Sequence, residues 1–257
     1  MSDQRMKRYA RHIVLKKIGV KGQRKLLDAR VLVAGAGGLG SPAALYMAAA
    51  GIGTIGIADG DVVELSNLQR QIMYSAADVG MEKTRSAAEA IRGLNSDVSV
   101  NIYDTFLSSQ NIMEIIDPYD FILDCTDNVS SKFLINDACV IAEKPFVHAG
   151  IGSFYGQIMT YAPGAAPCCR CVFGDPDEAD DAQRRRGGVI GAVCGVIGSL
   201  QAMEAIKYII GIGDLLSGRI LTYDALTAEF RTLKTSGRVD DCPVCGTNPT
   251  ITEIGRK

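Results

Sequence analysis

Three glycines and an acidic residue carry the clearest chemical signal in the sequence. Gly35, Gly37 and Gly40 form a G-x-G-x-x-G pattern directly after the apolar run 31–34. Glycines at these positions permit a tight turn from a strand into a helix, and they let backbone N–H groups approach a phosphate. Asp59 follows 24 residues after Gly35, where such a site carries an acid for the ribose hydroxyls. We therefore expect a nucleotide site, although Asp-Gly-Asp is also the composition of a surface turn.

Polar and cationic residues gather just after this acid. Asn67, Arg70 and Gln71 lie in the loop 64–71, and Lys83 lies in the first turn of the next predicted helix. Two cations suit a triphosphate better than the bridging pyrophosphate of a dinucleotide. The alternatives are a surface salt bridge for Arg70 and an exposed cation for Lys83. Because a cation is unfavourable at a helix N-terminus, a bound anion would help to explain Lys83.

A second acid, Asp127, follows the buried run 121–124 and could hold Mg²⁺. The glycine loop, Asp59 and Asp127 would then come from the carboxyl ends of three strands, which predicts one shared pocket at that edge of a sheet. The chain has only two histidines, His12 and His148, and neither follows a predicted strand in the position that would face a nicotinamide. This disfavours a dinucleotide oxidoreductase.

Two C-x-x-C pairs, Cys168 with Cys171 and Cys242 with Cys245, predict a separate metal site. Four thiolates on two knuckles suit tetrahedral zinc, and four protein ligands leave no open coordination position, so the expected role is structural. Cys169 leaves a Cys169/Cys171 pair open as an alternative, and ordinary buried thiols are another. The first residues contain no apolar signal-peptide region, so the eight cysteines favour thiols or metal ligands over a disulfide framework.

Strands and helices alternate along the first two thirds of the chain. Strands are predicted at 31–34, 54–58, 98–103, 121–124, 145–150 and 155–161, and helices at 41–50, 81–94, 108–116 and 129–142. This alternation predicts an α/β, Rossmann-like fold with a mostly parallel, twisted sheet and helices on both faces. Residues 3–29 are expected to be helical, with breaks at Gly19 and Gly22.

The last third of the chain has a different composition. Residues 175–186 are dense in charge and predict a mobile loop. Residues 189–210 predict a long apolar helix that is buried against the sheet or a partner subunit. Residues 219–223 and 229–233 predict a C-terminal β extension. We expect one domain over 1–257, with N-terminal helices in 1–29, a nucleotide-binding core in 30–150 and a further part, 151–257, that holds the zinc knuckles.

Charge and hydropathy limit the classes of partner. Of the 257 residues, 47% are hydrophobic, and the net charge of −2 provides no basic field for nucleic acid. Apolar runs are interrupted before they reach about 18 residues, so no membrane span is expected. These features predict a cytoplasmic protein.

In combination, the motifs resemble the MoeB/ThiF/HesA family, which comprises bacterial and archaeal relatives of ubiquitin-activating enzymes. The resemblance is carried by the segments 35–41, 59–71, 80–83, 124–128 and 196–207 and by both C-x-x-C pairs, and it extends from 8 to 245. It implies an ATP-dependent adenylyltransferase that activates the C-terminal glycine of a ubiquitin-like sulfur carrier of the MoaD or ThiS type. Members act in molybdopterin synthesis, thiamine thiazole synthesis and thiolation, and they are typically homodimers. The carrier would bind the part 151–257.

The resemblance also implies a role for each matching residue. Arg11 would reach into the nucleotide site of the partner subunit, while Asn67, Arg70 and Lys83 would contact the phosphates. Asp127 matches the aspartate that binds Mg²⁺, and Asp59 matches the ribose acid. The matching motifs add Gly38, Asp61, Ser66, Leu68, Gln69, Gln71 and Asn128 to the expected nucleotide-binding residues.

One segment departs from the ThiF-like pattern. Residues 183–189 read Gln-Arg-Arg-Arg-Gly-Gly-Val, with arginine where some relatives carry a cysteine that forms a thioester or persulfide. The chain is similar here to MoeB-like members, which predicts adenylation without a covalent enzyme intermediate. Cys194 is the alternative nucleophile, unless it is a small residue packed at a helix start.

Three other function classes share some features with this sequence. A tRNA-modifying relative is disfavoured by the near-neutral charge and by the four-cysteine site. An NAD oxidoreductase is supported by the glycine loop alone. An inactive adaptor subunit is disfavoured because Arg11, Arg70, Lys83 and Asp127 are all present.

Overall fold

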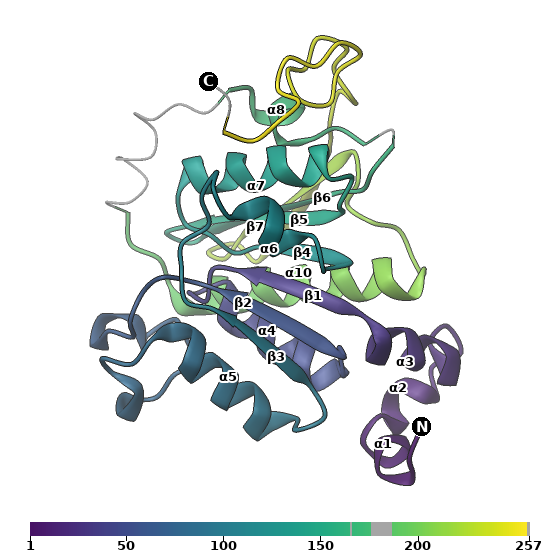
Figure 1. Ribbon diagram of the computed structural model, residues 1–257, viewed down its shortest axis with the longest axis vertical. Helices are drawn as coiled ribbons and strands as arrows, with labels where there is room; N and C mark the ends of the chain where they lie inside the picture. Colours follow the sequence, from purple (N-terminus) through teal and green to yellow (C-terminus); the bar gives the residue numbers. More distant parts are fainter. Residues whose placement is uncertain (165, 176–186, 256–257) are drawn as a thin grey trace.

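The computed structural model describes residues 1–164, 166–175 and 187–255, and one eight-stranded sheet runs through it (Figure 1). The strand order across the sheet is β3-β2-β1-β4-β5-β6-β7-β8. The strands are β1 (Arg30–Ala34), β2 (Thr54–Ala58), β3 (Ser99–Tyr103), β4 (Phe121–Asp124), β5 (Phe146–Gly152), β6 (Tyr155–Tyr161), β7 (Arg219–Asp224) and β8 (Glu229–Lys234). Neighbours among β1 to β5 are parallel, whereas β6, β7 and β8 join antiparallel. The predicted sheet and its C-terminal β extension are confirmed.

Helices cover both faces of this sheet (Figure 1). They include α4 (Gly40–Ala50), α5 (Lys83–Leu94), α6 (Ile112–Ile116), α7 (Val129–Ile141), α8 (Cys169–Phe173) and α10 (Gly191–Ile210). In β1, Val31 and Val33 pack in one core with α4 and α10, while Leu32 and Ala34 pack in the other with α6 and α7. Successive residues of a strand point to opposite faces. The continuous apolar run of β1 is therefore explained by a strand that is covered on both sides.

Helices α4 and α10 each end where a glycine adopts a left-handed conformation. Gly51 follows α4 with φ +83°, and Gly211 follows α10 with φ +81°. Glycine adopts this conformation without a steric penalty and is common just after a helix. Pro42 lies in the first turn of α4, where a missing N–H is tolerated. The boundaries predicted from the sequence for these two helices are correct to within two residues.

By length and composition, α10 could cross a membrane, since it is long and has few charges. Half of that window is buried within the protein, however. Two polar side chains on α10, Gln201 and Glu204, are also buried. Glu204 accepts hydrogen bonds from Thr160 Oγ1 at 2.6 Å and from Leu216 N at 2.8 Å. These features are those of a core helix, as predicted for 189–210.

The N-terminal region and α6 differ from their predicted forms. Three helices, α1 (Asp3–Arg8), α2 (Ala10–Ile13) and α3 (Gly19–Asp28), occupy the first 28 residues. The predicted break at Gly22 is wrong, since Gly22 lies within α3. Glycine suits this position because a Cβ there would approach Ile18 and Ile210 to 3.1 and 3.2 Å. Helix α6 begins later than predicted, since Asn111 Oδ1 accepts the N–H of Ser108 in a preceding turn.

The predicted mobile loop 175–186 falls almost entirely outside the described residues, which stop at 175 and resume at 187. Its conformation therefore stays a prediction.

Candidate active site

The glycine loop follows β1 and packs tightly between the ends of the two strands that flank it, β2 and β4. Gly35 has φ +95° and donates its N–H to Ala58 O at 2.8 Å. A Cβ at Gly35 would lie 2.7 Å from Cys125 O, and one at Gly40 would lie 2.0 Å from Gly35 O. Only glycine fits at these two positions, and α4 begins at Gly40. The loop therefore presents bare backbone at the carboxyl ends of the strands, as the sequence predicts.

We expect Gly40→Ala to lower the free energy of unfolding by about 3 kcal/mol, and the melting temperature by about 10 °C. The added methyl group meets the backbone of Gly35, which cannot move without disturbing β1 and β4. Gly93→Ala is the matched control, since Gly93 lies inside α5 with open space around it. Alanine there should be neutral or stabilising. A lower melting temperature for Gly93→Ala than for Gly40→Ala would contradict this geometry.

Asp59 lies directly after β2, beside the glycine loop. Its carboxylate accepts hydrogen bonds from Ala36 N at 2.7 Å and from Asp61 N at 2.9 Å. Burial raises the pKa of the Asp59 carboxyl, while Lys83 and the two N–H groups act in the opposite direction. These hydrogen bonds hold Asp59 against the glycine loop. An acid in an exposed surface turn would be surrounded by water instead.

Lys83 begins α5 and is nearly buried, with 6% of its surface exposed. Its Nζ lies 2.8 Å from Asp61 Oδ2 and 4.0 Å from Asp59 Oδ1. These two carboxylates supply the negative charge at this helix start. The position of Lys83 is therefore explained without a bound anion, and its role at a phosphate stays a prediction.

The loop 64–71 is held by its own polar groups. Asn67 Oδ1 accepts the N–H of Glu64 at 3.1 Å, and the Arg70 guanidinium donates to Ser66 O at 3.1 Å. Gln71 is 3% exposed, and its Oε1 has no hydrogen-bond partner among the described residues. The Gln71 side chain also lies against Gly37. A buried oxygen without a donor beside the glycine loop fits a site that is completed by a bound molecule.

The remaining residues of this loop have mixed surroundings. Ser66 is exposed and donates to Glu64 Oε2 at 3.1 Å, and Leu68 packs on the hydrophobic core. Gln69 is exposed, and its backbone carbonyl lies against Gly191 at the start of α10. The structure therefore brings Arg70, Gln71 and Lys83 toward the glycine loop, whereas Ser66 and Leu68 support the turn.

Asp127 lies in the loop that joins β4 to α7. Cys125 N donates to Ala34 O at 2.8 Å, which holds this loop against the end of β1. Asp127 itself is exposed. Asn128 caps α7 by accepting the N–H of Ser131 at 2.7 Å, as predicted. The glycine loop, Asp59 and the Asp127 loop thus meet at one edge of the sheet.

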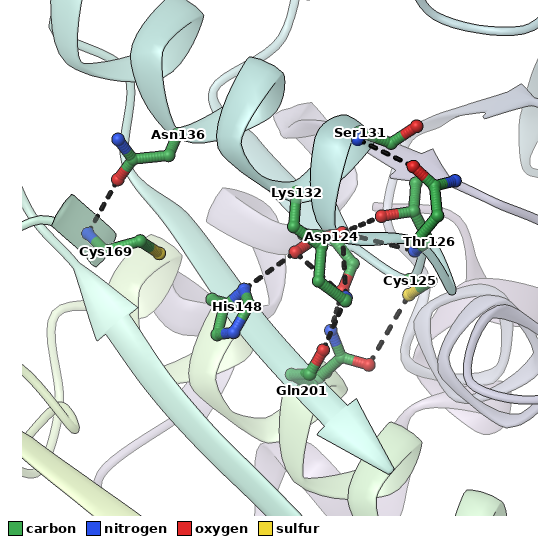
Figure 2. Close-up of polar contacts among 11 residues, drawn as sticks. Asp124, Cys125, Thr126, Ser131, Lys132, Asn136, His148, Cys169 and Gln201 are labelled. Carbon is green, nitrogen blue, oxygen red and sulfur yellow. Dashed lines mark hydrogen bonds and ion pairs between the residues drawn. The ribbon is translucent and has the colours of Figure 1, made fainter. Parts of the chain in front are cut away.

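A buried ionic cluster around Asp124 was not predicted from the sequence (Figure 2). Asp124 is fully buried, and its carboxylate contacts His148 Nδ1 at 2.8 Å and Lys132 Nζ at 3.2 Å. Thr126 Oγ1 donates to the same carboxylate at 2.6 Å. Burial alone would raise the pKa of Asp124, but Lys132 and His148 lower it to about 2.

Phe106 lies beside the same candidate nucleotide site, although no sequence motif indicates it. It follows β3, its side chain is 62% exposed, and its ring lies against Gly60, next to Asp59. An exposed aromatic ring beside a candidate ribose acid is suitable for stacking on a nucleotide base. An unusual aromatic residue after a predicted strand is the only signal that could have identified it.

Cys194 lies beneath the glycine loop and is fully buried. A Cβ at Gly38 would be 2.9 Å from its Sγ, and burial raises the pKa of the thiol against the opposing effect of Arg70. A reactive cysteine needs thiolate character and access. The structure therefore favours the small packed residue over the alternative nucleophile.

The four predicted zinc ligands converge. The sulfurs of Cys168, Cys171, Cys242 and Cys245 all lie within 4.8 Å of one another. Distances of 3.3 to 3.9 Å separate individual pairs, and tetrahedral zinc with Zn–S bonds of about 2.3 Å places its sulfurs roughly 3.8 Å apart. Cys169 is not in this group, and its backbone N–H donates to Asn136 Oδ1. The cluster therefore fits zinc and favours Cys168 over Cys169.

Arg11 lies far from the glycine loop of its own chain. The N-terminal helices pack at the amino ends of the strands: Gly53 N, before β2, donates to Leu26 O, and Asn95 donates to Tyr9 OH (Figure 1). Arg11 is exposed there. The glycine loop lies at the opposite, carboxyl end of β1, so Arg11 and the glycine loop of the same chain lie at opposite ends of that strand.

The model of the ThiF family matches residues 9–244. The chain belongs to the ThiF family. The resemblance inferred from the motifs is thereby confirmed.

This ThiF-family chain is 45% identical over 255 residues to the adenylyltransferase and sulfurtransferase MOCS3 of Culex quinquefasciatus, an alignment that covers 99% of the chain and 58% of that relative. It is 47% identical over 247 residues to MOCS3-1 of Zea mays, covering 96% and 53%. The chain thus spans just over half the length of these relatives.

Solved structures agree with this assignment. The structure of E. coli MccB with ATP superposes with a TM-score of 0.80 at 26% identity, covering 93% of this chain and 74% of that one. The E. coli MccB complex with MccA-N7isoASN gives a TM-score of 0.81 at 25% identity, covering 96% and 76%.

Proposed function

We propose that this chain is an ATP-dependent adenylyltransferase that activates the C-terminal glycine carboxylate of a ubiquitin-like sulfur carrier as an acyl-adenylate. The observation that carries this proposal is the convergence of the glycine loop, Asp59 and the Asp127 loop at one edge of the sheet, beside Arg70 and Lys83. The names of the MOCS3 relatives and the ATP complex of MccB support the choice of nucleotide and reaction.

The reaction requires no general base. A terminal carboxyl group has a pKa of about 3.3–3.7, so it is an anion at neutral pH. One carboxylate oxygen forms a bond to the α-phosphorus of ATP while the bond from that phosphorus to the α–β bridging oxygen breaks. Pyrophosphate leaves with the bridging oxygen and its electron pair. Catalysis then consists of positioning two anions and neutralising the charge on the leaving group.

In this proposal each residue has a role that follows from its position in the site. The backbone of the glycine loop receives the phosphates, and Asp59 accepts hydrogen bonds from the ribose hydroxyls. Arg70 and Lys83 neutralise the negative charge of the phosphates. To do so, Lys83 leaves the carboxylate of Asp61 and binds a phosphate oxygen. Asp127 would hold Mg²⁺, which adds positive charge at the phosphates when bound. Zinc bound by the four cysteines would have a structural role, since no open ligand position is left.

The proposal includes a homodimer and a carrier that ends in Gly-Gly. Because Arg11 lies at the amino end of its own sheet, it can serve a nucleotide only in a second copy of the chain. The carrier is expected to bind within 151–257 and to extend its tail toward Asp127. Sulfur transfer, which the names of the MOCS3 relatives include, is not assigned to Cys194, whose thiol is buried.

The proposal is tested by ATP–pyrophosphate exchange. Exchange that depends on added MoaD-type or ThiS-type carrier supports it, and the absence of exchange with every small Gly-Gly carrier would remove it. Tight tRNA binding at physiological salt would favour a tRNA-modifying relative instead.

Asp59→Ala is expected to raise the KM for ATP by roughly 10- to 100-fold, because a charged hydrogen-bond acceptor for the ribose is lost. Asp120→Ala is the matched control. Asp120 accepts the N–H of Arg30 at 2.8 Å at the amino end of β1, as Asp59 accepts that of Ala36 at the carboxyl end. Equal KM values for the two variants would show that Asp59 has no role in binding ATP.

A further inference from the structure

We propose that Lys132 and His148 are positioning residues, which act through the carboxylate of Asp124 to hold the loop 125–128 and thereby Asp127. This inference rests on the proposed function only for the role of Asp127. The anchoring of the loop is a separate claim about the protein itself.

The first step is the charge balance around Asp124. This carboxylate has no exposure to solvent, and a buried carboxylate needs compensating charge and hydrogen bonds. Lys132 Nζ supplies the charge, at 3.2 and 3.3 Å from the two carboxylate oxygens. His148 Nδ1 supplies a hydrogen bond at 2.8 Å from the adjacent strand, where it is in register with Asp124.

The second step connects Asp124 to the loop. Asp124 Oδ1 accepts hydrogen bonds from both Thr126 N, at 3.2 Å, and Thr126 Oγ1, at 2.6 Å. Thr126 directly precedes Asp127. The carboxylate that Lys132 and His148 hold thus fixes the residue next to the exposed acid. If Lys132 is replaced by an apolar residue, Asp124 must take up a proton or move, and either change disturbs the bonds to Thr126.

Further contacts tie the surroundings of Asp124 together. Gln201 Nε2, from α10, donates to Asp124 O at 2.8 Å. Lys132 Nζ also donates to Ala149 O at 2.6 Å, which ties α7 to β5. The His148 ring packs against Phe173 of α8. Strand β5 and helices α7, α8 and α10 therefore meet around Asp124, through its carboxylate, its backbone carbonyl or the His148 ring, just before the loop that carries Asp127.

The test compares Lys132→Met and His148→Leu with two conservative variants. Lys132→Arg keeps the charge, and His148→Asn places an amide N–H near the position of Nδ1. Lys144→Met is the matched control, since Lys144, just after α7, also donates to backbone carbonyls of another segment, Asp117 O at 2.6 Å and Tyr119 O at 3.0 Å, which precede β4. Two quantities are measured: amide hydrogen exchange of peptides covering 125–128, and the Mg²⁺ concentration that half-saturates ATP–pyrophosphate exchange.

We expect faster amide exchange in 125–128 for Lys132→Met and His148→Leu, and a roughly tenfold higher half-saturating Mg²⁺ concentration. For Lys132→Arg, His148→Asn and Lys144→Met, the amide exchange rates and the half-saturating Mg²⁺ concentration should both stay close to the wild-type values. If Lys132→Met does not fold, the comparison of His148→Leu with His148→Asn tests the anchoring of the loop 125–128 by itself. Unchanged amide exchange in the apolar variants, or an equal change in Lys144→Met, would overturn the inference. A wild-type protein without pyrophosphate exchange would remove the proposed function alone, because amide exchange still reports on the anchoring.

Discussion

Mixing Arg11→Ala with Asp127→Ala is expected to restore activity that neither variant has alone. Arg11→Ala should lose roughly 10³-fold in ATP–pyrophosphate exchange. In a statistical mixture of dimers, half are heterodimers, and each of these contains one site with an intact Asp127 and an intact Arg11 from the other subunit. The mixture should therefore recover about a quarter of wild-type activity.

The physical reason is the position of Arg11 in its own subunit. The N-terminal helices lie at the amino ends of the strands, and β1, five residues long, separates them from the glycine loop. Five strand residues span roughly 16 Å, which is longer than an arginine side chain. Both residues are exposed, so their loss should leave the fold intact. Arg24→Ala, which alters another exposed cation of the N-terminal helices, is the control. A mixture as inactive as its components would contradict a site shared between subunits.

The second large effect concerns the four cysteines. Cys242→Ser is expected to release one equivalent of zinc and to lower the stability by several kcal/mol, since metal binding by such a site is coupled to folding. The loss should be greatest in the C-terminal segment, because Cys242 and Cys245 tie this segment to Cys168 and Cys171 around α8. Zinc content by mass spectrometry and thermal unfolding with and without chelator measure the two effects.

Cys169→Ala is the control for this experiment. Cys169 is as deeply buried as Cys168 and directly adjacent to it, but its sulfur lies outside the cluster. The variant should keep its zinc and lose only the small packing contribution of one thiol. Zinc loss in Cys169→Ala together with zinc retention in Cys242→Ser would show that the ligand set is wrong.

The sequence carries local signals for the parts of the site that depend on local geometry. The glycine pattern after an apolar run identifies the loop because only glycine fits at Gly35 and Gly40. Asp59 and Asp127 are identified because each follows the carboxyl end of a buried strand, Asp59 directly after β2 and Asp127 in the loop after β4. Parallel strands bring such positions to one edge of the sheet. The cysteine pairs are identified by a spacing that lets one turn present two sulfurs.

The parts that depend on pairing between distant segments could not be derived in this way. Asp124 meets His148 only because β4 and β5 pair in a particular register, which no local pattern specifies. Lys83 has its anionic partners because a chain bend brings Asp61 to the start of α5. Helix α8 has five residues, too few for a helical period to be visible in the sequence.

The central claim, that this chain transfers an adenylyl group to a carrier, is tested most directly by the mass of the carrier. Purified protein is incubated with ATP, Mg²⁺ and a MoaD-type or ThiS-type carrier that ends in Gly-Gly, and the carrier is then analysed by mass spectrometry. We predict a carrier species heavier by one adenylyl group, formed with release of pyrophosphate and lost when the terminal glycine is removed. An unmodified carrier in the presence of protein that binds ATP would contradict the claim.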